Sequence, residues 1–279
     1  MRVLRVAFAA VAVAIVSGCI QSSTMIKMKP DGSGTIEETM TMSAEAIAQF
    51  GALAAMADDR DKKGSKGSLD DLFSEKDARA AAAKMGQGVT FVSSQKIDTP
   101  DRKGLKAIYA FTDIRKIKLE EMNAPNVGDP GGLSASSTPK DPPMTFQFTH
   151  LPRGNALLTI LQPDVEKVLN ETPNASKPNA AVDPKMAEQG IEMMKTFMKG
   201  LKIDVAVQVP RVIKTNSAYV DGRTVTLLSM DFDQVLADPK MLERMNNAKT
   251  LADSKALLKD FKGIKVNLQP QLTIEFAGR

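Results

Sequence analysis

Cys19 is the only cysteine of the chain, and the residues before it form a recognisable pattern. Arg2 and Arg5 give a basic start, eleven apolar residues occupy positions 6–16, and a small Ser-Gly pair precedes the cysteine. Eleven apolar residues are too few for a helix that spans a bilayer, which needs about 20. They fit the apolar core of a secretory signal with small residues before the cleavage point. The pattern therefore predicts export, with chemistry at the Cys19 sulfur.

This segment resembles the bacterial lipoprotein signal, whose lipobox ends in a small residue, Gly and Cys. The resemblance implies diacylglyceryl transfer to the Cys19 sulfur, cleavage after Gly18 and acylation of the new amino terminus. Three acyl chains would anchor the protein stably, which a single chain does not. Ile20, not Asp, follows the cysteine, which implies the periplasmic leaflet of the outer membrane in a diderm cell. In a monoderm cell it implies the outer face of the plasma membrane. An ordinary signal peptide that contains a cysteine is the alternative.

The composition excludes several kinds of catalytic and metal chemistry. Once Cys19 is lipidated, no thiol remains for a disulfide, a zinc site or a nucleophile. His150 is the only histidine, so one chain cannot build a multi-histidine metal site. We interpret His150 as a structural residue at a strand end, because no Gly-x-Ser-x-Gly motif accompanies it. The sequence predicts a non-enzymatic protein with no metal and no cofactor, and a hydrolase is the less favoured alternative.

The charge balance gives no support to nucleic acid as a partner. Removal of residues 1–18 leaves 261 residues with 35 basic and 33 acidic side chains, and no long cationic run. Nucleic-acid-binding domains gather basic residues on one face. The predicted partners are therefore the membrane, through the N-terminal lipid on Cys19, and either a lipid ligand or an envelope protein.

The 16 methionines admit three interpretations. Thioethers fill gaps in cores, line pliable pockets for apolar ligands such as acyl chains, and bind Cu(I). Most of them share the parity of core positions, so core packing is the favoured interpretation and copper the least favoured. A helix predicted over 184–200, from the Asp183-Pro184 start to the Gly200 end, has a Met-rich apolar face. The candidate apolar pocket on that face consists of Met186, Met194, Phe197 and Met198.

Four predicted hairpins, each followed by a short helix, make up the mature chain. Alternating apolar residues and turn signals predict these hairpins within 25–42, 89–111, 144–161 and 201–230. A last strand over 264–276 alternates in the same way, with Pro270 as its one break. Clean alternation indicates one buried and one wet face, as antiparallel sheets permit. We therefore predict an α+β fold: an antiparallel sheet of repeated hairpin-helix units, with helices packed on one face and the other face solvated.

The predicted domain organisation is simple. Residues 1–18 are the signal peptide, residues 19–24 a lipidated tether and residues 25–279 one α+β domain. Three stretches rich in Gly, Ser, Pro, Asn or charge predict mobile loops within that domain, because each is longer than an ordinary connection. They lie near residues 58–67, 123–143 and 171–182.

Two passages resemble a group of bacterial envelope lipoproteins that includes the mycobacterial LppM type. The first is the Asp31-Gly-Ser-Gly34 hairpin soon after the lipid cysteine, and the second is the stretch 209–227. In that stretch Arg211 replaces the usual Gly and Leu227 the usual aromatic residue. The resemblance implies an α+β domain that handles lipid or binds at the envelope, and it supplies no catalytic residues. A structural subunit of an envelope complex, which would use the polar sheet face, is the alternative.

Overall fold

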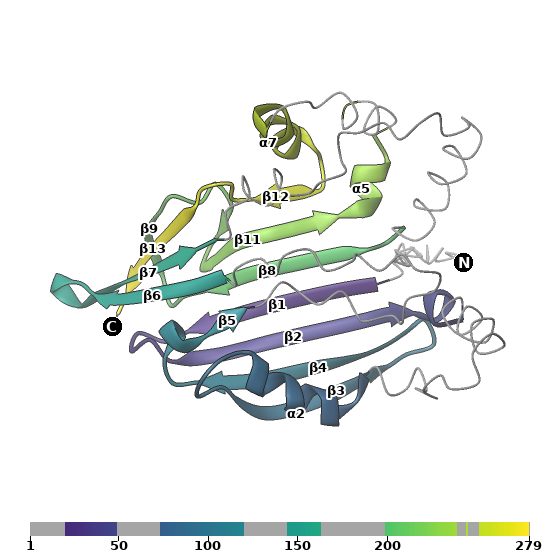
Figure 1. Cartoon of the computed structure of the whole chain (residues 1–279), viewed down its shortest axis with the longest axis horizontal. Coiled ribbons are helices and arrows are strands. Elements are labelled where there is room, and N and C mark those ends of the chain that lie inside the picture. Colours follow the sequence, from purple (N-terminus) through teal and green to yellow (C-terminus); the bar gives the residue numbers. More distant parts are fainter. Residues whose placement is uncertain are drawn as a thin grey trace, which may run out of the picture.

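The computed structural model describes residues 20–48, 73–119, 144–162, 199–238, 244 and 251–278. These residues form two β-sheets with helices at their margins (Figure 1). The large sheet has the strand order β10-β11-β8-β1-β2-β4-β3, with β12 also paired to β11. The second sheet has the order β5-β6-β7-β13-β9.

Along the chain, groups of one to four consecutive strands belong in turn to one sheet and then to the other. The strands of the large sheet are β1 (Ile20–Met28), β2 (Gly34–Ser43), β3 (Thr90–Asp98), β4 (Arg102–Phe111), β8 (Lys202–Gln208), β10 (Val220–Asp221), β11 (Thr224–Asp231) and β12 (Ile264–Val266). Those of the second sheet are β5 (Lys118–Leu119), β6 (Met144–His150), β7 (Asn155–Leu161), β9 (Val212–Thr215) and β13 (Gln271–Ala277). The described helices are α2 (Glu75–Lys84), α5 (Phe232–Leu236) and α7 (Leu251–Asp260), with helical residues also at 44–48 after β2 and short 3-10 helices at Ile114–Lys116 and Pro152–Gly154.

All four predicted strand pairs form, in the order β1–β2, β3–β4, β6–β7 and β8–β11. The turn chemistry of the first explains its glycines. Gly32 has φ +87°, which favours glycine, and a Cβ on Gly34 would lie 2.1 Å from the carbonyl oxygen of Lys27. The local signals in the sequence therefore specify the first three pairs as hairpins, whereas β9 and β10 lie between β8 and β11.

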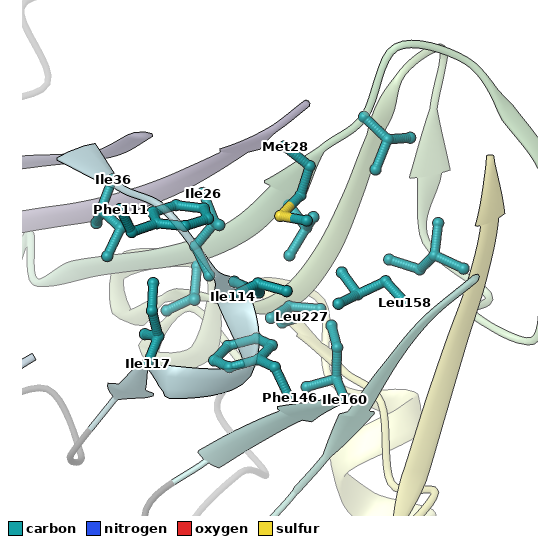
Figure 2. Packing of buried hydrophobic residues seen from close by; sticks show 14 of the residues in the cluster. Ile26, Met28, Ile36, Phe111, Ile114, Ile117, Phe146, Leu158, Ile160 and Leu227 are labelled. Atoms are coloured by element: carbon teal, nitrogen blue, oxygen red, sulfur yellow. The ribbon is translucent and has the colours of Figure 1, made fainter. Parts of the chain in front are cut away.

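The predicted packing of helices over one antiparallel sheet is wrong. The inner face of the large sheet packs against the second sheet, and fully buried side chains of both point toward one another (Figure 2). Ile26 and Ile36 come from the large sheet, whereas Leu158 and Ile160 come from the second. Helix α2 closes only the margin beside β3, where its Ala78 and Ala82 join the same core. Alternation shows that each strand has a buried face, but it cannot show whether a helix or another strand covers that face.

Two connections that were expected to stay in one sheet cross to the other. The predicted strand 264–276 divides at Pro270 into β12 of the large sheet and β13 of the second sheet. In the same way the chain passes Pro210 between β8 and β9. Because proline cannot donate to a strand ladder, both positions suit a change of sheet. The large sheet is also mixed, since β1 and β8 run parallel.

One irregularity of β11 is stabilised by a buried side chain. The pairing of β11 with β8 shifts between Thr226 and Leu228, which is a β-bulge. The Asn267 amide, 2% exposed, donates to the carbonyl oxygen of Thr226 at 2.7 Å, and its oxygen accepts from the Ser217 hydroxyl at 3.0 Å. Asn267 therefore satisfies backbone that the bulge leaves without a ladder partner.

The structure starts the first strand earlier than the sequence suggested. Residues 20–24, predicted as part of a tether, belong to β1, which pairs with β2 from Ile20 onward. Cys19 and Gly18 lie outside the described residues. So do the three predicted loops near 58–67, 123–143 and 171–182.

Candidate functional site

The candidate site is the end of the large sheet at which β1 begins, because the predicted lipid attachment adjoins it. Strand β1 lies in the middle of the sheet, between β2 and β8. Ile20 pairs with Met42 of β2, and Gln21 pairs with Lys202 of β8. We call this end, where β1, β4 and β8 start and β2, β3 and β11 finish, the anchor end.

Backbone contacts close the anchor end on both sides of β1. On one side the Ala44 N–H, just after β2, donates to the carbonyl oxygen of Asp101, just before β4, at 2.9 Å. On the other side the Phe232 N–H donates to the carbonyl oxygen of Leu201 at 3.0 Å, which joins the end of β11 to the start of β8. The strand ends around Ile20 are therefore fixed to one another rather than frayed.

A charged pair adds to this closure between β8 and β11. The Lys202 ammonium lies 2.9 Å from the Asp231 carboxylate, which also caps α5 by accepting from the Gln234 backbone N–H at 3.4 Å. Partial burial opposes ionisation of Asp231, but the hydrogen bonds from Lys202 and Gln234 outweigh it and lower the pKa of this carboxyl. Asp231 is therefore ionised at neutral pH and links Lys202 of β8 to the start of α5.

A small apolar cluster covers the inner face at the anchor end. It consists of Met42, Ala46 and Phe73, with Ile20 packed against it. Ser43 holds Ala46 in place, since its hydroxyl oxygen accepts from the Ala46 N–H at 3.1 Å, as a helix N-cap does. Beside it lies a depression of about 60 Å³ lined by Phe73, Lys96, Ile97, Asp98, Lys103 and Gly104. Ligand pockets usually measure about 300–1,000 Å³, so this depression is too small for an acyl chain.

Glu38 is the unexpected member of the inner face. It lies on β2 at the parity of Ile36 and Met40, opposite the buried Thr24, and it hydrogen-bonds to Tyr109 of β4. Burial raises the pKa of the Glu38 carboxyl, and the bond from Tyr109 only partly offsets this. The sequence does contain a signal for Glu38, because an acidic residue stands there between apolar residues of the same parity.

The outer face of the large sheet is polar, as its sequence parity predicted. Lys27 and Lys106 flank Glu37, with ammonium-to-carboxylate distances of 2.5 and 3.2 Å. The hydrogen bond from Lys27 is the main reason why the pKa of Glu37 is lowered, with Lys106 adding to it. This ladder joins three neighbouring strands across a solvated surface.

His150 and the methionines are the other residues that the sequence offered for catalysis or metal binding. His150 is exposed at the end of β6, with its ring edge-on to Phe148 at 5.0 Å between centroids. Met28 and Met42 lie in the core, as predicted, whereas Met25 occupies the opposite face of β1 from Met28. Within the described part of the chain, no three His, Cys, Asp or Glu side chains gather to hold a metal ion.

The predicted pocket residues Met186, Met194, Phe197 and Met198 lie outside the described residues. No helix in the part of the chain that the structure describes is long and apolar enough to cross a bilayer. Of the predicted sites, the structure therefore describes only the strand that follows Cys19.

Comparison with known proteins adds one weak structural similarity. No protein-family model matches the chain, and no curated protein is similar to it. Among solved structures it is similar to the folded domain of Mycobacterium tuberculosis LppM, determined by NMR, with a TM-score of 0.31 and 10% identity. The similarity covers 93% of this chain and 90% of that one.

Proposed function

We propose that this chain is a lipid-anchored, non-enzymatic protein of the bacterial cell envelope. The signal-like segment before Cys19 supports the anchor, and the start of β1 at Ile20 is the observation that carries the proposal. Cleavage after Gly18 would leave Cys19 as the first residue, so that only one residue would precede the described start of β1. Lipidated Cys19 would then hold the two-sheet body directly at the membrane.

Membrane fractionation of the producing bacterium tests the anchor. We expect the wild-type chain in the membrane fraction, and a Cys19→Ser variant exported by an ordinary cleavable signal peptide in place of residues 1–18 in the soluble fraction. Ser23→Ala is the matched control, since it changes a nearby hydroxyl on the outer face of β1 and keeps the thiol; it should stay with the membrane. A Cys19→Ser protein that stays with membranes would overturn the proposal.

We propose that the anchored body binds an envelope protein or an apolar ligand. The polar outer face with its Lys27–Glu37–Lys106 ladder supports the first role, because it is a broad solvated surface with fixed charges of both signs. The second role depends on the Met-rich face of residues 184–200. Crosslinking in intact cells, with and without Glu37→Gln, tests the first role, and the absence of any crosslinked neighbour would refute it. Native mass spectrometry tests the second by searching for co-purified lipid.

The same proposal places the protein in a specific leaflet. In a diderm cell we propose the periplasmic leaflet of the outer membrane, and in a monoderm cell the outer face of the plasma membrane. Ile20 after the cysteine supports this assignment. Separation of inner and outer membranes by density, followed by detection of the chain, tests it directly.

A further inference from the structure

We propose that the anchor end of the large sheet contacts the lipid headgroups, so that the strands lead away from the bilayer. The inference rests on the proposed lipidation of Cys19. One peptide unit separates Cys19 from Ile20, which places their Cα atoms about 3.8 Å apart. Because Ile20 is already paired within β1, no flexible linker is left between the lipid and the sheet.

The position of β1 makes this attachment rigid. A strand at a sheet edge could detach by breaking one ladder, but β1 is paired with β2 on one side and with β8 on the other. The contacts Ala44 to Asp101 and Phe232 to Leu201 close the neighbouring strand ends. Release of enough chain to form a tether would break both ladders at once. The lipid therefore fixes the orientation of the body, not only its location.

The described surface at the anchor end is polar enough to contact a headgroup layer, and its charges favour neither neutral nor anionic lipids. Its exposed residues include Ala44, Glu45, Pro100 and Asp101. Cationic and anionic side chains occur there in similar numbers: Arg102, Lys103, Lys199 and Lys202 against Glu45, Asp98, Asp101, Asp231 and Asp233. We therefore expect the same orientation on neutral and on anionic bilayers, because a balanced surface gains little net attraction from anionic lipid.

The opposite end of the large sheet faces away from the membrane in this arrangement. Strand β1 has nine residues, and at about 3.3 Å per residue it spans about 26 Å. The β1–β2 turn, with the exposed Lys29, should thus lie well outside a headgroup layer that is only about 5–8 Å thick on each side.

The test depends on the fact that Cys19 is the only native cysteine. Since the Cys19 sulfur carries lipid, a second cysteine is the only free thiol, so Asp101→Cys and the matched Lys29→Cys can each take one fluorophore. The full chain, lipidated in the cell and purified in detergent, is placed in vesicles of phosphatidylethanolamine and phosphatidylglycerol with spin-labelled headgroups. We expect several-fold stronger quenching of the Asp101→Cys label than of the Lys29→Cys label. Vesicles of neutral phosphatidylcholine should give the same ratio.

A linker variant and a mass measurement separate the outcomes. Ten Gly and Ser residues inserted after Cys19 should bring the two labels to similar quenching, because the body can then tumble. Equal quenching, or the reverse order, in the chain without the insertion would overturn the orientation while leaving the anchor intact. An N-terminal peptide without acyl mass on Cys19 would overturn the anchor, and the orientation with it.

Discussion

The two-sheet core makes one quantitative prediction about stability. Ile160 of the second sheet and Ile36 of the large sheet are each 0% exposed, and both lie in the core between the sheets. Substitution of either by Ala removes three carbon atoms from that core. At about 0.8 kcal/mol for each buried carbon the transfer cost is about 2.4 kcal/mol. The cavity left behind brings the expected loss to about 3–4 kcal/mol.

Ile213→Ala is the matched control for this prediction. Ile213 belongs to β9 of the same second sheet, but it is 44% exposed, so the same chemical change should cost less than about 1 kcal/mol. Because most domains are stable by only about 5–15 kcal/mol, the difference between the variants is readily measured.

Urea unfolding of the chain that begins at residue 19, with Cys19→Ser, provides the assay. Far-ultraviolet circular dichroism reports both sheets, and tyrosine fluorescence reports Tyr109 of β4 together with Tyr219, just before β10. We expect coincident transitions with an unchanged urea dependence and a lower midpoint for Ile160→Ala and Ile36→Ala. If Ile160→Ala cost no more than Ile213→Ala, the inter-sheet core would be refuted.

Three further substitutions test single features of the fold. Burial raises the pKa of Glu38, so the folded protein holds that proton more tightly than the unfolded chain, and stability falls as pH rises from the unfolded to the folded pKa. Glu38→Gln should therefore gain more stability relative to the wild type at pH 7 than at pH 4, and an equal gain in urea titrations at both would contradict the assignment. Asn267→Ala removes the side-chain bonds at the β11 bulge and should cost about 1–3 kcal/mol in urea unfolding; a smaller loss than that of Asn216→Ala would count against this role. Ser43→Ala should cost about 1 kcal/mol through the lost cap on Ala46, whereas Ser43→Thr, which keeps the hydroxyl, should retain most of the stability in thermal melts.

Local features of the fold were predictable from the sequence. The turn at Asp31–Gly34, the cap at Ser43 and the four strand pairs depend on residues close together in the chain, and all of them form. The parity of residues 272, 274 and 276 correctly gave a buried face. What covers that face depends on strands far apart in sequence, and the pattern carries no information about their order.

The sheet changes at Pro210 and Pro270 show this limit most clearly. Residues 264–276 keep one alternation apart from Pro270 and were therefore predicted as one strand, but β12 and β13 belong to different sheets. The parallel pairing of β1 with β8 joins residues about 180 positions apart, as Gln21 with Lys202 shows. No local signal specifies such a partner.

The candidate site was predictable only in part. The sequence singled out Cys19 through its neighbours, but it assigned residues 20–24 to a tether, whereas they belong to β1. Glu38, the one charged residue on the inner face of β2, was also missed, because only the apolar alternation was counted.

The lipid on Cys19 is the central claim, and intact mass spectrometry of the N-terminal peptide of the membrane-extracted protein tests it most directly. We predict a peptide that begins at Cys19 and carries a diacylglyceryl group on sulfur and an acyl chain on the amino group. The Cys19→Ser variant should yield no such peptide. An unmodified Cys19 in the wild-type protein, or a mature terminus at any other residue, would contradict the account.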